Sequence, residues 1–155
     1  MCVIQTLTSS HRNFKCSGNS KRASALSIFP KTARKGLPLR AVFGNIDSAE
    51  ARLEFPEHLK FRCEDVKVWI THIGGYPGRY APAVREMIKV HTPNLFICGH
   101  SHILKVMNDK RLNLLHMNPG AVGTYGIHNV RTMLRFEISG DKIQNLEVIE
   151  FKRNA

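Results

Sequence analysis

The amino-acid sequence predicts an α/β fold, because short β-rich runs alternate with turns that carry glycine and polar residues. Four apolar runs each end in such a turn, at residues 39–43, 66–70, 94–98 and 112–116. We find no internal repeat, and no apolar run approaches the ~18 residues that a membrane span needs. The 155 residues therefore fit one domain with one core.

The four turns share one position, directly after an apolar strand. In chain order they read Gly44-Asn45-Ile46-Asp47, Thr71-His72, Gly99-His100-Ser101-His102 and Asn118-Pro119-Gly120. In open α/β sheets, functional sites form outside the carboxyl ends of the strands. We therefore expect all four turns to meet at one edge of the sheet.

The remaining elements are one helix and one hairpin. Pro82 predicts the first turn of a helix, since proline is favoured at that position and Val84 and Ile88 follow at helical spacing. Residues 133–138 and 143–151 flank a Ser-Gly-Asp turn and predict a closing β-hairpin with alternating faces.

Residues 1–37 differ in composition from the rest of the chain. Of 23 basic residues, eight lie in the first 40 residues, and the first acidic residue is Asp47. The net charge of +11 is thus concentrated there, and the remainder holds 15 basic and 12 acidic residues. We expect residues 1–37 to be a disordered or non-native segment and residues 38–155 to form the domain.

Three interpretations of this basic segment stay open. A gene-model artefact and a transit peptide both fit the composition, so the sequence does not separate them. The artefact is slightly favoured. A nucleic-acid-binding arm is disfavoured, because only Phe14 and Phe29 offer rings for stacking on bases.

The four cysteines show no CxxC spacing: Cys2, Cys16, Cys63 and Cys98. Free thiols in a reducing compartment are therefore expected. This favours a cytoplasmic protein, or an organellar one if the basic segment is a transit peptide.

Position selects the candidate ligands among eight histidines. His100 and His102 follow a glycine that ends an apolar strand, but His-x-His alone is a weak signal. His72 occupies the same place after its own strand, and Asn45 follows Gly44. Three imidazoles and an amide oxygen from separate strand ends suit a divalent cation such as Zn, Mn, Fe or Ni.

In this order, the four turns resemble the later motifs of the calcineurin-like metallophosphoesterases, especially the small single-domain bacterial phosphodiesterases. The resemblance covers about residues 38–151. It implies two packed mixed sheets flanked by helices, and hydrolysis of phosphate esters or nucleotides through two divalent cations. Asn45, His72 and His100 resemble the ligands of the second cation, and His102 resembles the last ligand of the first. The three histidines are thereby the candidate catalytic residues, acting through the metal.

The same resemblance assigns supporting parts. Asn118-Pro119-Gly120 is similar to a turn that shapes the site without binding metal. Tyr76 and Arg79 lie in a glycine-rich loop that would face substrate phosphate. Because a loop arginine is more often solvated, no substrate-binding residue is assigned.

Two family motifs are missing from this sequence, a strand ending in Asp-x-His and another ending in Gly-Asp. The nearest match places Ser9-Ser10 before His11, which we interpret as coincidence. The aspartate of the second motif bridges the two metals in the family. We therefore expect an incomplete domain of marginal stability that binds at most one cation weakly and hydrolyses phosphodiesters poorly.

A second interpretation is a non-catalytic protein-binding scaffold, as the retromer subunit with this fold is. It would explain the missing ligands. A scaffold has little reason to keep His72, His100 and His102 together, so an enzyme by descent is the favoured interpretation. Neither interpretation involves a membrane or nucleic acid.

Overall fold

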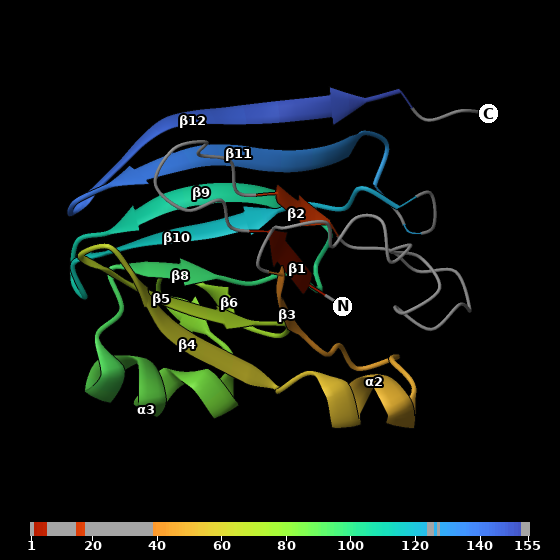
Figure 1. The fold of residues 1–155 in the computed structure, drawn as a ribbon, viewed down its shortest axis with the longest axis horizontal. Coiled ribbons are helices and arrows are strands. Elements are labelled where there is room, and N and C mark those ends of the chain that lie inside the picture. Colours follow the sequence, from red (N-terminus) through yellow and green to blue (C-terminus); the bar gives the residue numbers. More distant parts are fainter. Residues whose placement is uncertain (1, 6–14, 18–38, 124–125, 127, 153–155) are drawn as a thin grey trace.

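The computed structural model describes residues 2–5, 15–17, 39–123, 126 and 128–152. Its elements are shown in Figure 1. In chain order they are β1 (Cys2–Gln5), β2 (Lys15–Ser17), β3 (Leu39–Val42), α2 (Ala49–Glu54), β4 (His58–Cys63), β5 (Val66–Thr71), β6 (Gly75–Tyr76), β7 (Arg79–Tyr80), α3 (Pro82–His91), β8 (Leu95–Ile97), β9 (Leu104–Asp109), β10 (Leu114–Pro119), β11 (Arg131–Ser139) and β12 (Lys142–Phe151).

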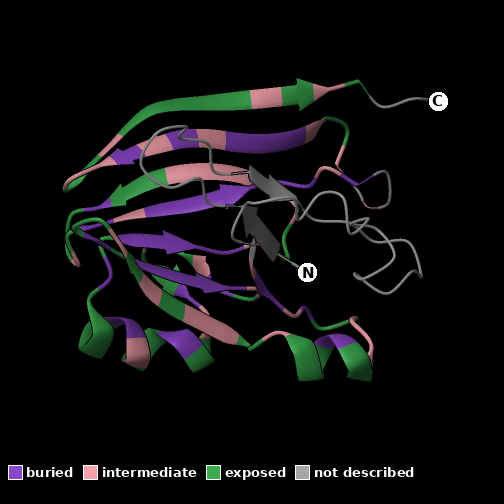
Figure 2. Ribbon diagram, in the orientation of Figure 1, coloured by how far each residue is buried: buried purple, intermediate pink, exposed green. Residues whose placement is uncertain are grey.

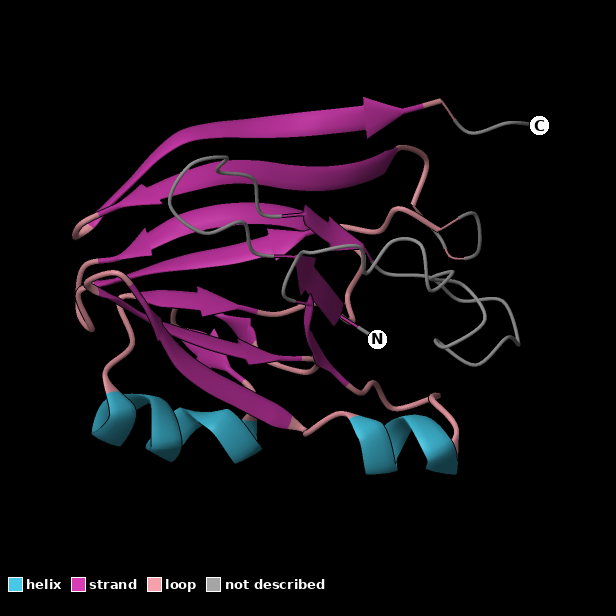
Figure 3. Cartoon of the chain, viewed as in Figure 1, coloured by secondary structure: helices cyan, strands magenta, loops and turns pink. Residues whose placement is uncertain are grey.

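A mixed five-stranded sheet forms the centre of the fold, in the order β4-β5-β8-β10-β9. The three inner strands are parallel, and the two edge strands are antiparallel to their neighbours. Smaller sheets are formed by β2-β1-β3, by the β11-β12 hairpin and by β6-β7. In the view of Figure 3, both helices lie at one side of the strands and the β11-β12 hairpin at the other.

Successive side chains of a strand point to opposite faces of a sheet. The inner strands of the central sheet are buried on both faces, because another layer packs on each face. On one face, Trp69 of β5 and Phe96 of β8 pack against Val84 and Ile88 of α3. The other face packs against β3 and β11. Its cluster consists of Val42, Val66, Val68, Ile70, Leu95, Ile97, Met117, Leu134, Phe136 and Ile138.

Figure 2 shows that β5, β8, β10 and β11 consist largely of buried residues. The central sheet therefore lies between a helix and a second β-layer. This is the α/β arrangement of packed sheets with a flanking helix that the sequence predicts.

Most predicted elements are confirmed. The strands predicted at residues 39–43, 66–70 and 94–98 are β3, β5 and β8, within two residues at each end. The predicted helix is α3, which has Pro82 in its first turn. The predicted hairpin is β11-β12, in which Ser139 pairs with Lys142 across the turn.

The fourth strand was predicted too early. It is β10, Leu114–Pro119, so Asn118 and Pro119 belong to the strand and not to the turn that follows it. Pro119 can end the strand because it lies opposite Leu104, at the limit of the pairing with β9. The edge strands β4 and β9 and the short helix α2 were not predicted.

β1 and β2 lie within the segment for which the composition indicates no regular structure. β1 pairs antiparallel with β3, with Cys2 opposite Val42. His11 and its neighbours Ser9 and Ser10 lie outside the described residues. The division of the chain at residues 37 and 38 stays a prediction.

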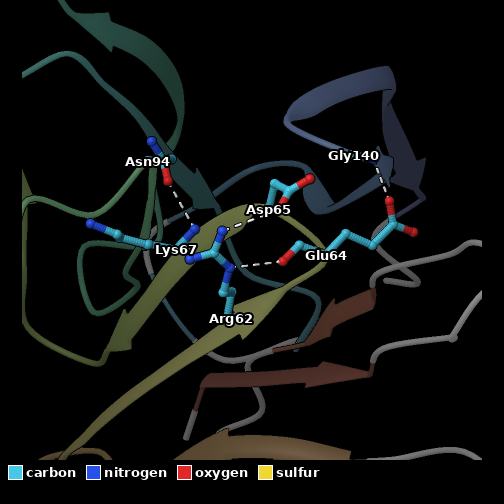
Figure 4. A network of polar contacts seen from close by, with 6 residues as sticks. All are labelled: Arg62, Glu64, Asp65, Lys67, Asn94 and Gly140. Atoms are coloured by element: carbon cyan, nitrogen blue, oxygen red, sulfur yellow. Dashed lines mark hydrogen bonds and ion pairs between the residues drawn. The ribbon is translucent and has the colours of Figure 1, made fainter.

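A polar network closes the start of β5, at the opposite end of that strand from His72 (Figure 4). Nη2 of Arg62 donates to Asp65 Oδ1 at 3.1 Å, and the backbone N–H of Lys67 donates to Asn94 Oδ1 at 2.9 Å. The carboxylate of Glu64 accepts from the backbone N–H of Gly140. The β4-β5 turn is thereby tied to the β11-β12 turn.

Cys63 and Cys98 carry free thiols, as expected. Neither described helix combines the length and apolar character that would let it cross a bilayer.

Candidate metal centre

Two candidate ligands meet where β3 and β5 end. Nε2 of His72 lies 3.0 Å from Oδ1 of Asn45. His72 follows the last residue of β5, and Asn45 lies in the loop after β3. The contact therefore joins strands of two different sheets, and it brings together two turns that the sequence predicts to converge.

The loop that carries Asn45 is held by its own neighbours. The backbone N–H of Gly44 donates to Asp47 Oδ2 at 2.6 Å. Nη2 of Arg52 in α2 donates to the carbonyl oxygen of Asn45 at 3.0 Å, and its Nε donates to that of Asp47 at 3.3 Å. The short helix α2 thus fixes the loop that presents the Asn45 side chain.

His100 lies beside His72. The two rings are edge to face, with centroids 5.2 Å apart. Their backbones are also linked, since the N–H of Gly99 donates to the carbonyl oxygen of His72 at 3.0 Å. Among the candidate ligands, His72 is therefore close both to Asn45 and to His100.

His102 lies beside a histidine that the sequence analysis did not select, His128. Their rings are edge to face, with centroids 5.3 Å apart. His128 lies before β11, and in the sequence it does not come directly after an apolar run. Nothing in its sequence context separates it from a surface histidine, so only the fold reveals it.

Asn118 shapes the loop that carries His100 and His102. Its Nδ2 donates to the carbonyl oxygen of Gly99 and to Oγ of Ser101, both at 3.0 Å. Its Oδ1 accepts from the N–H of Gly120 at 3.1 Å. Asn118 is buried at the end of β10, so these contacts anchor the loop to the central sheet.

Both His72 and His102 resist protonation. Burial lowers the pKa of His72 from 6.5 to about 4; His100 lowers it further, and Asp47 opposes the shift. Burial also lowers the pKa of His102, with His128 and His100 adding to the effect. Near neutral pH both rings are therefore uncharged, the state in which an imidazole can bind a cation.

The donor set fits one cation only in part. Within the described residues, no three His, Cys, Asp or Glu side chains form a group that could hold a metal ion. Nε2 of His72 donates a hydrogen bond to Oδ1 of Asn45 at 3.0 Å, a spacing that also matches neighbouring ligands of an octahedral ion bound at about 2.1 Å. A cation bound there would require the Nε2 proton to move to Nδ1. The structure thus arranges the candidates as neighbouring pairs, and the four-ligand pocket stays a prediction.

The glycine-rich loop after His72 offers no fixed phosphate ligand. Arg79, the first residue of β7, is exposed to solvent. The ring of Tyr76 lies 4.0 Å from Nζ of Lys105, measured to the ring centroid. The loop is anchored to the central sheet, because Nε2 of buried His116 in β10 lies 3.0 Å from the carbonyl oxygen of Gly75.

Comparison with known families identifies the fold. A family model described as the calcineurin-like phosphoesterase superfamily domain matches residues 5–141. The chain belongs to this superfamily. The match begins before the segment that resembles the family motifs, so it also takes in part of the basic N-terminal region of the chain. A search of curated proteins returned no match.

Solved structures share the fold at low sequence identity. Wild-type Vps29 complexed with zinc, from Entamoeba histolytica, matches with a TM-score of 0.54 and 15% identity over 74% of this chain and 69% of that chain. A predicted phosphoesterase from Streptococcus pneumoniae gives a TM-score of 0.55 and 20% identity over 74% and 62%. An archaeal phosphodiesterase gives a TM-score of 0.53 and 21% identity over 70% of this chain and 67% of that chain. These likenesses establish the calcineurin-like phosphoesterase fold and nothing finer.

Proposed function

We propose that this calcineurin-like phosphoesterase binds one divalent cation through Asn45, His72 and His100 and hydrolyses a small phosphate ester or nucleotide slowly. The observation that supports this most directly is the 3.0 Å approach of His72 Nε2 to Asn45 Oδ1. The identity of the cation, among Mn, Zn, Ni and Fe, stays open, as does the ester.

The roles of the residues follow from their positions. A cation at this site would polarise a phosphoryl oxygen and acidify a bound water. Asn45 and His72 hold one side of the site, and His100 approaches from the neighbouring loop. Asn118 keeps that loop in register with the sheet.

Slow turnover follows from charge. The amide of Asn45 and the imidazole of His72 are neutral donors, so no carboxylate among the three proposed ligands offsets the charge of a cation. Asp47, the nearest acidic residue in sequence, accepts from the backbone N–H of Gly44. We therefore expect weaker binding and slower hydrolysis than a site with bridging carboxylates would give.

Isothermal titration with Mn²⁺ and Zn²⁺, together with hydrolysis of bis(p-nitrophenyl) phosphate, tests the proposal. His72→Gln should weaken cation binding at this site by at least about tenfold and abolish hydrolysis. His91→Gln is the matched control, because His91 is an exposed histidine at the end of α3. Cation binding and hydrolysis that are unchanged in His72→Gln would refute the proposal.

A protein-binding scaffold is the second candidate. It is favoured by three exposed isoleucines that directly follow candidate ligands: Ile46 is 70%, Ile73 44% and Ile103 58% exposed. Exposed apolar side chains around a site suit a protein partner better than a phosphate. The scaffold becomes the better proposal if cation binding is measured but neither phosphomonoesters nor phosphodiesters are hydrolysed. Cytoplasmic localisation stays a prediction.

A further inference from the structure

We propose that the outer edge of β4 binds an extended segment of another protein, in which acidic residues alternate with apolar ones, as an additional strand of the central sheet. This surface is separate from the candidate metal centre and goes beyond the proposed hydrolysis. Its basis is the direction of the β4 backbone, the charge of the β4 side chains and the way one of those side chains is held.

The backbone of β4 has hydrogen-bonding groups that β5 does not use. β4 ends the strand order of the central sheet, and within the described residues it pairs only with β5. Arg62 of β4 lies opposite Lys67, whose backbone N–H and carbonyl oxygen both bond to Asn94, each at 2.9 Å (Figure 4). The polar backbone groups of Lys67 thus point away from β4. Since such positions alternate along an antiparallel pair, the N–H and C=O groups of His58, Lys60 and Arg62 point to the outer edge.

A contact at the start of β4 agrees with this direction. The carbonyl oxygen of Pro56, two positions before His58, accepts from the backbone N–H of Phe43 at 3.1 Å. Phe43 follows β3, a strand that lies outside the central sheet. A segment from outside the sheet can therefore bond to backbone groups on this side of the chain, as Phe43 does.

The same strand presents positive charge along its edge. Lys60 and Arg62 lie on one face of β4, because alternate residues of a strand share a face, and both are exposed. Lys67 is also exposed, opposite Arg62 on the same face. Asp65 offsets part of the charge, since its Oδ1 accepts from Nη2 of Arg62 at 3.1 Å. Carboxylates on the same face of an added strand would lie opposite these cations, a favourable cross-strand pairing.

Lys60 is held in place by Trp69, which lies opposite it on β5. Nζ of Lys60 lies over the ring of Trp69, 4.5 Å from its centroid. Trp69 is itself fixed, because it is buried and packs edge to face against Phe96, with ring centroids 5.3 Å apart. A cation that is already held over an aromatic ring loses less side-chain freedom when it pairs with a carboxylate.

Charge selects the occupant of this edge. A second copy of the chain would bring its own Lys60 and Arg62 alongside these residues, and like charges on neighbouring strands destabilise the pairing. The N-terminal region of the chain does not complement the edge, because no acidic residue precedes Asp47. Lysine on an edge strand also disfavours pairing with apolar strands. An acidic extended segment satisfies all three conditions.

The test is titration of the full chain into a fluorescein-labelled peptide in which glutamate alternates with valine, followed by fluorescence anisotropy. We expect saturable binding, and Lys60→Glu should weaken it about threefold to tenfold because the new carboxylate repels the peptide. Lys110→Glu is the matched control and should bind as the parent does. Lys110 is an exposed lysine in the turn after β9, the strand at the opposite edge of the sheet. Circular dichroism establishes that both variants fold.

Two further peptides separate strand addition from attraction between charges alone. They carry N-methyl groups either on the glutamates or on the valines. Only one of these sets of N–H groups would face β4, so one peptide should bind at least about tenfold more weakly than the other. In the complex with the unmethylated peptide, the backbone amides of Lys60 and Arg62 should exchange hydrogen more slowly, and that of Lys110 should not change.

Three results would overturn the inference: no binding of the acidic peptide, equal affinity of all three peptides, or unchanged exchange at Lys60 and Arg62. A single-stranded RNA oligonucleotide that binds the parent but not Lys60→Glu, while the peptide does not bind, would assign the edge to nucleic acid instead. Neither result depends on cation binding or hydrolysis, so the inference and the proposed function can fail separately.

Discussion

The imidazole of His116 holds the carbonyl oxygen of Gly75, with Nε2 only 3.0 Å away although 41 positions separate the two residues. His116 lies in β10 and is fully buried, and its Nδ1 has no hydrogen-bond partner among the described residues. Since the carbonyl oxygen only accepts, Nε2 carries the proton of the neutral ring. The glycine-rich loop beside the candidate metal centre thus rests on an uncharged histidine.

This arrangement predicts that acid destabilises the protein. Burial lowers the pKa of His116 from 6.5, so the unfolded chain binds the proton more readily than the folded one. The contribution of His116 to the free energy of unfolding is therefore largest above about pH 6.5. It falls as the pH drops below that value, until His116 of the folded protein is also protonated. Urea denaturation at a series of pH values measures this. His116→Gln should flatten the dependence, and a slope unchanged from the parent would contradict the assignment.

Asn118→Ala should destabilise the protein by about 1–3 kcal/mol, because it removes a buried side chain that bonds to Gly99, Ser101 and Gly120. The loop that carries His100 would lose its anchor, so cation affinity should fall as well. Chemical denaturation and calorimetric titration measure the two effects. Asn108→Ala, at an exposed asparagine of β9, should change neither. Full cation affinity in Asn118→Ala would show that the loop does not need this anchor.

Gly120→Ala should be more destabilising than Gly78→Ala. Both glycines have positive φ, 77° and 82°, which costs an alanine about 1–2 kcal/mol. A Cβ at Gly120 would also lie 2.1 Å from Oγ1 of Thr132, which is buried and donates to Pro119, whereas nothing lies within 4 Å at Gly78. The difference between the two variants in urea denaturation reports the crowding at Thr132. Equal losses would mean that backbone conformation alone accounts for both.

Tyr80→Phe should cost about 1.5–3 kcal/mol in the free energy of unfolding. The hydroxyl of Tyr80 donates to Oδ2 of Asp109 at 2.7 Å, and both residues are buried, so the variant leaves a buried carboxylate oxygen without this donor. Burial and this contact raise the pKa of Tyr80, which keeps the hydroxyl protonated. Tyr76→Phe, at a more exposed tyrosine, should stay within about 0.5 kcal/mol of the parent. A similarly small loss in Tyr80→Phe would show that Asp109 finds another donor.

The sequence predicts the ends of strands correctly where an apolar run ends in a turn that contains glycine. β5 and β8 are buried on both faces apart from Lys67, and their apolar runs made their ends and the histidines after them predictable. β4 was missed because Lys60 and Arg62 face solvent along an edge strand and interrupt its apolar pattern. The end of β10 was misplaced because Asn118 and Pro119 were interpreted as a turn, although the pairing with β9 continues through them.

Part of the candidate site could not be predicted from sequence. His128 lies beside His102 although the two residues are far apart in the sequence, and no local pattern encodes that contact. The partnership of His116 with Gly75 is equally non-local, since it depends on how β10 lies beneath the β6-β7 loop. Contacts between residues that are far apart in the sequence are set by tertiary packing, so the spacing of residues along the chain does not predict them.

His100 and His102 both have left-handed backbone conformations, with φ of 68° and 58°. Such a conformation costs a residue with a Cβ roughly 1–2 kcal/mol, a penalty that glycine escapes. Glycine at either position should therefore make the chain fold more stably while removing an imidazole from the proposed centre. At these two positions, stability favours glycine, whereas cation binding requires histidine. The histidines are therefore residues that stability alone would not select.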